Sequence, residues 1–292
     1  MIRRCRKSVH RFIQRALGHL AMPSAQRQAE TAILLECAGL SFEDVFKDPD
    51  ASIHPERWAT VRELLRRRLR DRVPVQYLAG KAGFYGLTLN VTPDTLIPRP
   101  ETELLVEAAL GFLQTRRGVS ACDIGVGSGA IILALADRLR ERPDLAFFAS
   151  DVCPRALAVA RHNARALSLT ERITFAEGDL LSPFAGWRFD LIVSNPPYID
   201  PALKPTLADE VTAHEPSLAL FASEDGYDLY GRLLAQAPGF LTRGGALMIE
   251  LGDGMRDGVL SLARRHGFGQ TACLKDLSGH DRVLSLGVDD KD

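Results

Sequence analysis

The spacing of apolar residues changes near residue 73 and divides the chain into two parts. Over residues 29–40 and 55–69, apolar residues recur at helical spacing, and the second segment carries an Arg-rich polar face. The helical segment is predicted to end at Val73-Pro74, because the residue before a proline is disfavoured in the α region. We therefore predict a small helical domain over residues 1–73.

Residues 74–98 differ from the first part in composition, which predicts a structured linker between two domains. Residues 77–97 are rich in aromatic and β-branched side chains and are interrupted by glycine and proline. Such a segment is typical of a short β-hairpin.

Strand-like and helix-like segments alternate from residue 99 onward. The predicted strands are 119–124, 145–151, 173–179, 190–195 and 246–252, and the predicted helices are 101–113, 130–139, 154–167 and one near 226–237. This order predicts a mostly parallel sheet with helices on both faces. Segments 268–276 and 282–288 are separated by a short turn, which predicts an antiparallel hairpin at the sheet edge. We expect residues 99–292 to form an α/β domain with a seven-stranded sheet.

Composition and charge narrow the functional classes. Hydrophobic residues make up 46% of the 292 residues and charged residues 25%, which is ordinary for a globular protein. The longest strictly apolar run has seven residues, too few to span a membrane. The net charge of −1 divides into +6 over residues 1–72, from 15 basic and 9 acidic residues, and −7 over the remainder. The basic part is either a solvated helical face or a surface for an anionic partner.

Cysteine and histidine usage gives no sign of a disulfide framework or a metal site. The five cysteines form no Cys-x-x-Cys pair, and the seven histidines follow no ligand spacing. This usage favours the cytoplasm, with an organelle matrix as the alternative.

A glycine-rich turn, DIGVGSG at residues 123–129, joins a predicted strand to a predicted helix. Glycines there permit a tight turn and a close approach of a ligand to the backbone, although a purely structural turn is also possible. The spacing differs from the GxGxxG of dinucleotide enzymes, so the phosphate-free cofactor S-adenosylmethionine fits better. The residues of this turn expected at the cofactor are Gly125, Val126, Gly127, Ser128 and Gly129.

Acidic residues stand at the ends of the first three predicted strands of the sheet. Asp151 lies 22 residues after Gly129, where a carboxylate can accept hydrogen bonds from both ribose hydroxyls, or else can cap the next helix. Asp179 and Leu180 follow the third strand, a position from which they could meet the adenine ring. Asp123 could act on the methionyl ammonium group, directly or through water, or serve as a buried structural residue.

The motif Asn195-Pro196-Pro197-Tyr198 follows the fourth strand and carries the most specific chemical signal. The prolines stiffen the loop and remove two donors, which leaves the Asn195 Oδ1 atom and the Pro196 carbonyl as two converging acceptors. Two acceptors suit a planar NH2 group, whose lone pair is then directed toward a methyl donor. We expect Tyr198 to form a wall of this pocket and to stack on the planar group.

These motifs resemble those of a known enzyme family. NPPY after a DxGxGSG turn is shared by class I Rossmann-like methyltransferases that act on adenine or on glutamine. Further segments resemble the protein-(glutamine-N5) methyltransferases that modify peptide-chain release factors; they are IPRPETE at 97–103, FYG at 84–86, VTP at 91–93, the segment 210–216 and KDLSGHDRV at 275–283. The resemblance covers roughly residues 30–288.

The resemblance implies methyl transfer from S-adenosylmethionine to the amide nitrogen of the glutamine in the Gly-Gly-Gln loop of class 1 release factors. It carries over, as cofactor contacts, Gly125, Gly127, Gly129, Asp151, Leu180 and Asn195. It carries over Asn195 to Tyr198 as the glutamine pocket. We expect residues 1–73 to serve as a docking arm for a folded protein substrate. Arg99 and Glu101 either brace the linker or shape the pocket.

Three alternatives stay open: glutamine methylation of a ribosomal protein, adenine-N6 methylation of nucleic acid, and a non-catalytic module that binds the cofactor. The sequence at 98–103 favours release factors over the ribosomal protein. The net negative charge of the part that carries NPPY argues against nucleic acid. We expect a monomer with no stable nucleic-acid or membrane partner.

Overall fold

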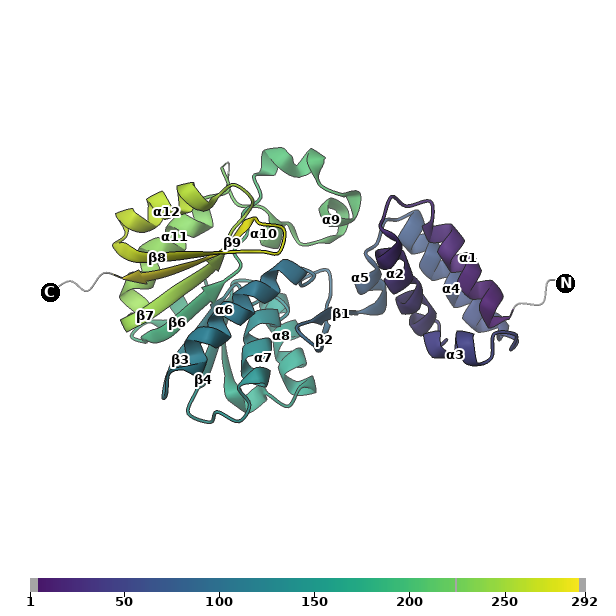
Figure 1. Cartoon of the computed structure of the whole chain (residues 1–292), viewed down its shortest axis with the longest axis horizontal. Coiled ribbons are helices and arrows are strands. Elements are labelled where there is room, and N and C mark those ends of the chain that lie inside the picture. Colours follow the sequence, from purple (N-terminus) through teal and green to yellow (C-terminus); the bar gives the residue numbers. More distant parts are fainter. Residues whose placement is uncertain (1–4, 224, 289–292) are drawn as a thin grey trace. The chain divides into compact units, whose positions relative to one another are not determined.

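The computed structural model describes residues 5–223 and 225–288 (Figure 1). The chain forms two compact units. The first contains the described residues up to Lys81 together with Ala208–His214, and the second contains Ala82–Leu207 and the described residues from Glu215 onward. The chain therefore leaves the second unit after residue 207 and returns to it at residue 215.

The first unit is helical, as the sequence predicts. Its helices are α1 (Arg6–Leu17), α2 (Ser24–Cys37), α3 (Phe42–Lys47), α4 (Pro55–Leu69), α5 (Val75–Ala79) and α9 (Asp209–His214). Helix α2 begins five residues before the predicted segment, because its first turn is polar and shows no apolar spacing. The apolar faces of α1 to α5 meet in one core that includes Ile13, Leu17, Leu34, Leu35 and Leu65.

A buried ion network holds α9 in the first unit. Arg68 of α4 is 4% exposed and pairs with Glu30 of α2 at 2.8 Å and with Glu210 of α9 at 2.9 Å. His214, at the end of α9, contacts the carbonyl oxygen of Asp71 at 2.7 Å. A buried guanidinium needs partners for its donors, so these contacts explain why a segment far along the chain belongs to this unit.

The predicted hairpin is present but shorter than expected. Strands β1 (Lys81–Phe84) and β2 (Leu87–Asn90) pair through a turn at Tyr85 and Gly86, whose φ values are 49° and 81°. Two successive positive φ values are the geometry of the tight turns that match strand twist. Residues 77–79 belong to α5 instead, and residues 91–97 have no regular structure.

The second unit contains the predicted seven-stranded sheet, in the order β5-β4-β3-β6-β7-β9-β8. Its strands are β3 (Ser120–Ile124), β4 (Ala146–Asp151), β5 (Ile173–Glu177), β6 (Phe189–Ser194), β7 (Leu241–Glu250), β8 (Phe268–Lys275) and β9 (Asp281–Val288). Strands β3 to β7 are mutually parallel and β9 is antiparallel to its neighbours β7 and β8. This confirms the α/β fold with an antiparallel hairpin at one edge.

Helices cover both faces of the sheet (Figure 1). The helices of this unit are α6 (Glu103–Gln114), α7 (Ala130–Arg138), α8 (Pro154–Ala166), α10 (Ser217–Leu220), α11 (Asp228–Gln236) and α12 (Arg256–Arg265), and its short 3-10 turns are η1 (Pro100–Thr102), η2 (Thr170–Arg172), η3 (Ser182–Phe184), η4 (Pro201–Thr206) and η5 (Ala237–Phe240). Alternate sheet residues face two separate cores: α6, α7 and α8 contribute to one, and α11 and α12 to the other. Within residues 5–223 and 225–288, no helix combines the length and the apolarity that crossing a bilayer requires.

Candidate active site

A cavity of about 650 Å³ opens at the carboxyl ends of β3, β4, β5 and β6. Strand β3 lies between β4 and β6, so the strand order reverses here. Ligands of open α/β sheets bind at this kind of position, and the volume falls in the range of small-molecule sites. The cavity therefore brings together the strand ends that the sequence singles out.

The glycine-rich turn forms one wall of the cavity. Gly125 and Gly127 have φ values of 75° and 53°, and a Cβ atom at either position would meet no atom within 4 Å. Their backbone thus faces open space, as close contact with a ligand requires. Gly129 has a different role: its φ is 89°, and a Cβ atom would lie 2.6 Å from Cδ1 of Leu133 in α7. Val126 and Ser128 also line the cavity.

Asp151 lines the cavity and organises the glycine turn at the same time. Its Oδ2 atom accepts a hydrogen bond from the Gly127 amide at 2.9 Å, and its Oδ1 atom accepts one from the Cys153 amide at 2.8 Å. Burial raises the pKa of this carboxyl group. A carboxylate has about four acceptor sites, so two remain for hydroxyl groups in the cavity. The N-cap of α8 is Cys153, so the helix-capping interpretation of Asp151 is wrong, whereas its position suits the ribose interpretation.

Asp179 and Leu180 line the cavity beyond Asp151, and Asp179 has an unexpected partner. Its carboxylate forms an ion pair with Arg232 of α11, which also lines the cavity. Sequence reasoning missed Arg232, because nothing near residue 232 marks it. Leu180 has a φ of 51°, and its carbonyl oxygen accepts a hydrogen bond from the Ser150 hydroxyl at 2.7 Å, which fixes the loop.

Asp123 lies beneath the cavity and is not among the described residues that line it. Its carboxyl group is 1% exposed, Oδ2 accepts a hydrogen bond from the Ile132 amide at 3.3 Å, and Oδ1 has no partner. Burial raises its pKa to about 7. The structure therefore does not support direct contact between Asp123 and a ligand in the cavity.

Asn195, Pro196 and Pro197 line the cavity as the motif predicts. The Asn195 Nδ2 atom donates a hydrogen bond to the hydroxyl of Thr102 at 3.1 Å. Because that bond occupies the nitrogen, the Oδ1 atom is the one left to accept a hydrogen bond from a ligand. Thr102 belongs to the segment IPRPETE but was not recognised as a site residue.

Tyr198 is not among the described residues that line this cavity, so its stacking role stays a prediction. Its ring packs with the apolar cluster that also includes Tyr227, Tyr230 and Met255, and burial raises its pKa. A Cβ atom on Gly252 would lie 2.8 Å from Cδ2 of Tyr198, so this glycine leaves room for the ring. Tyr198 is thus partly buried against this cluster.

Comparisons with known proteins identify the family. The family models described as Methyltransferase small domain and PrmC N-terminal domain match residues 101–215 and 9–80. The release factor glutamine methyltransferase of Caulobacter vibrioides is 39% identical over 264 residues, 90% of this chain and 90% of its own. That of Geobacter sulfurreducens is 39% identical over 279 residues, 95% of each chain. The chain belongs to the release factor glutamine methyltransferase family.

Solved structures support the fold of this family member. The hMettl16 catalytic domain in complex with MAT2A 3'UTR hairpin 1 matches with a TM-score of 0.56 and 15% identity, covering 88% of this chain and 92% of its own. The complex with hairpin 6 gives a TM-score of 0.55 at 15% identity, covering 81% and 83%. At this identity the likeness establishes the α/β methyltransferase fold alone.

Arg99 braces one edge of the cavity in this methyltransferase. Its guanidinium pairs with the carboxylate of Glu215 at 2.6 Å, and Glu215 also accepts a hydrogen bond from the Ile97 amide at 3.2 Å. Glu215 is 6% exposed, whereas the Arg99 side chain is 34% exposed. Arg99 thus contacts Glu215, which also binds the linker residue Ile97, and lines the cavity, so the bracing and pocket-shaping roles are compatible.

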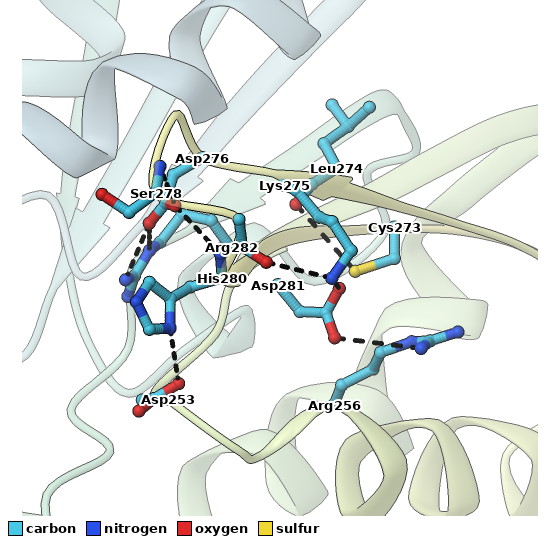
Figure 2. A network of polar contacts seen from close by, with 11 residues as sticks. Asp253, Arg256, Cys273, Leu274, Lys275, Asp276, Ser278, His280, Asp281 and Arg282 are labelled. Carbon is cyan, nitrogen blue, oxygen red and sulfur yellow. Dashed lines mark hydrogen bonds and ion pairs between the residues drawn. The ribbon is translucent and has the colours of Figure 1, made fainter.

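The segment KDLSGHDRV forms the turn between β8 and β9, where it carries a polar network (Figure 2). The Asp276 carboxylate accepts hydrogen bonds from the amides of Ser278 and His280 and pairs with Arg282 at 3.1 Å. Arg282 also donates to the Leu251 carbonyl at 3.1 Å. The motif thus holds the hairpin turn against the residue that follows β7.

Proposed function

We propose that this chain transfers a methyl group from S-adenosylmethionine to the side-chain amide nitrogen of the glutamine in the Gly-Gly-Gln loop of class 1 peptide-chain release factors. The names of the relatives, which are similar over nearly the whole chain, support this substrate. The observation that supports this chemistry is the position of Asn195. Its Nδ2 atom donates a hydrogen bond to Thr102, and Asn195 and Pro196 both line the cavity.

The residues of the cavity fit S-adenosylmethionine. Gly125 and Gly127 present backbone without side chains to the open space, and Asp151 keeps two acceptor sites for ribose hydroxyls. Leu180 offers an apolar surface for the adenine ring, and Asp179 stands beside it at the rim. When bound, this cofactor supplies an electrophilic methyl group on a sulfonium centre.

The chain itself positions the weak nucleophile. The Asn195 Oδ1 atom and the Pro196 carbonyl oxygen would each accept a hydrogen bond from one of the two N–H groups of the glutamine amide. These two hydrogen bonds favour a pyramidal glutamine nitrogen, whose lone pair is then less delocalised. They also hold the nitrogen in line with the methyl group that it displaces from sulfur. The nitrogen gains the methyl group and loses one proton to water, so no general base is needed before attack. Pro197 stiffens this loop, and Tyr198, which follows it, packs against the neighbouring apolar cluster.

The finer assignments belong to the same proposal. We assign residues 1–73 to docking of the release factor, residues 74–98 to the linker and residues 99–292 to catalysis. The excess of basic residues in the first part supports a protein partner with an acidic surface. We further propose a cytoplasmic monomer without a stable nucleic-acid partner.

Methyl transfer from labelled S-adenosylmethionine to purified release factor tests the proposal. The Gln→Ala form of the Gly-Gly-Gln loop is the matched control, and ribosomal proteins and nucleic acid serve as competing acceptors. Label on the wild-type factor alone supports the proposal. Label on a ribosomal protein or on nucleic acid, with none on the release factor, overturns it.

A further inference from the structure

We infer that Arg232 of α11 is a positioning residue for the cofactor, because it holds the Asp179 carboxylate at the adenine end of the cavity. The inference rests on the proposed function, because it adds a residue to the same cofactor site. Arg232 lies 53 residues from Asp179 in the chain, and the fold brings the two side chains together at the rim.

The strand order places the base of the cofactor near the end of β5. Asn195, the proposed acceptor site, follows β6, and Asp151, the residue assigned to the ribose, ends β4. Strand β3 lies between β6 and β4, and β5 lies beyond β4. A cofactor whose methyl group faces Asn195 and whose ribose contacts Asp151 therefore extends toward β5. Asp179 follows β5, and both Asp179 and Arg232 line the cavity.

Helix α11 gives Arg232 a rigid base. Tyr230, Leu233 and Leu234 are completely buried in the core that α11 shares with the sheet. Leu229 and Arg232 are three residues apart, so they are neighbours on the helix surface, and both line the cavity. Because the buried side chains fix the helix, the guanidinium has a restricted range of positions at the rim.

Two side chains of α11 hold the loop that carries Asp179. Arg232 forms an ion pair with the Asp179 carboxylate. Gln236, one helical turn further along, accepts a hydrogen bond from the Leu181 amide through its Oε1 atom at 3.3 Å. Leu180, between the two anchored residues, has a positive φ of 51°, a strained conformation that persists only where the surroundings support it. The helix therefore fixes the loop at two points.

The ion pair matters for ligand binding rather than for stability. The Arg232 and Asp179 side chains are 41% and 53% exposed, and exposed pairs add little to the free energy of unfolding. Arg232 donates to Oδ2 of Asp179, and a carboxylate has about four acceptor sites, so acceptor capacity remains for the amino group of adenine. Because Arg232 restrains the carboxylate before the cofactor arrives, the entropy cost of ordering it on binding is smaller.

The test is binding of S-adenosylhomocysteine to the full-length protein, measured by isothermal titration calorimetry. This compound keeps the adenine and the ribose but lacks the sulfonium charge, so it responds less than the cofactor does to a change of charge at the rim. The variants are Arg232→Gln, Arg232→Lys, Asp179→Asn and the double variant Asp179→Asn with Arg232→Gln. The matched control is Arg256→Gln. The Arg256 side chain is 46% exposed and pairs with Asp281 at 3.8 Å, and neither residue is among the described residues that line the cavity.

We expect Arg232→Gln to weaken binding about fivefold and Asp179→Asn about tenfold, the order expected for the loss of one hydrogen bond and of one charge-assisted hydrogen bond. The double variant should bind within about twofold of Asp179→Asn alone, because Arg232 acts through that carboxylate. Arg232→Lys should bind more tightly than Arg232→Gln and less tightly than wild type, because lysine keeps the charge but lacks the planar fork. Arg256→Gln should bind as wild type does.

Wild-type affinity in Arg232→Gln overturns the inference, and so do additive losses in the double variant, which mean that Arg232 does not act through Asp179. S-Inosylhomocysteine, which carries a carbonyl oxygen in place of the adenine amino group, gives a second readout. Wild type should prefer the adenosyl compound, and Arg232→Gln should lower this preference; an unchanged preference overturns the inference. No binding to wild type refutes the cofactor site and the inference together, whereas binding without methylation of release factor refutes only the proposed substrate.

Discussion

Replacement of Asp151 by asparagine tests whether this carboxylate holds the cofactor. The two side chains have the same shape, but asparagine has one oxygen and no charge. In the structure the two oxygens accept from the Gly127 and Cys153 amides, each with a further acceptor site toward the cavity. Asp151→Asn therefore places an NH2 group against one backbone amide and loses an acceptor for one ribose hydroxyl.

The magnitude follows from the hydrogen bonds that change. A hydrogen bond to a charged group contributes about 1.5–3 kcal/mol. Asp151→Asn removes the hydrogen bond to one ribose hydroxyl and removes the charge from the acceptor of the other. Together these losses weaken the binding free energy of the cofactor by about 2–3 kcal/mol. We therefore expect the Kd of S-adenosylmethionine to rise about 30- to 150-fold. Isothermal titration calorimetry measures it directly, without an acceptor protein.

A matched control separates ribose binding from general loss of charge at this edge of the sheet. Glu177 ends the neighbouring strand β5, pairs in register with Asp151, and is exposed outside the cavity. Glu177→Gln should bind the cofactor as wild type does. If Asp151→Asn binds within about threefold of wild type while remaining folded by urea denaturation, the assignment of Asp151 to the ribose is refuted.

Three other predictions concern single groups of the site. Asn195→Ala should abolish methylation of release factor in the labelling assay and change the cofactor Kd only a few-fold; full activity would exclude the acceptor role. Gly129→Ala should lower the free energy of unfolding by about 1–3 kcal/mol more than Gly186→Ala, because both positions have positive φ but only Gly129 also clashes with Leu133; equal losses in urea titrations would contradict this. Burial raises the pKa of Asp123 from 3.8 to about 7. As pH rises between these two values, Asp123 loses its proton in the unfolded state but keeps it in the folded state. The free energy of unfolding therefore falls over this range, by at most about 4 kcal/mol. Asp123→Asn should show a smaller fall between pH 5 and pH 8 in the same titrations, and an equal fall would refute the buried-charge explanation.

Local sequence patterns were sufficient for the sheet and for the strand ends that form the cavity. Alternating apolar strands and helices specify a parallel sheet, and parallel strands bring their carboxyl ends to one edge. Gly127, Asp151 and Asn195 could therefore be assigned to one site without knowledge of long-range contacts. Their separate signals, a tight turn and two polar strand ends, are each local.

Long-range partners could not be predicted in this way. Thr102 reaches Asn195 across 93 residues, and Arg232 reaches Asp179 across 53, and no periodicity links such pairs. The direction of the Tyr198 ring depends on the space beside Gly252, which is a property of packing. These features arise from tertiary contacts, so a single sequence records the residues but not their pairing.

The segment from Glu210 to Pro216 shows how one short motif serves two compact units. Glu210 pairs with buried Arg68 in the first unit, whereas Glu215 pairs with Arg99 in the second. The boundary between the units falls between these two carboxylates, at His214 and Glu215. Pro216, which follows at once, lines the cavity. The wall of the cavity is thus covalently continuous with a segment that is bound to the helical unit, and an acidic residue of the motif forms an ion pair on each side of that boundary.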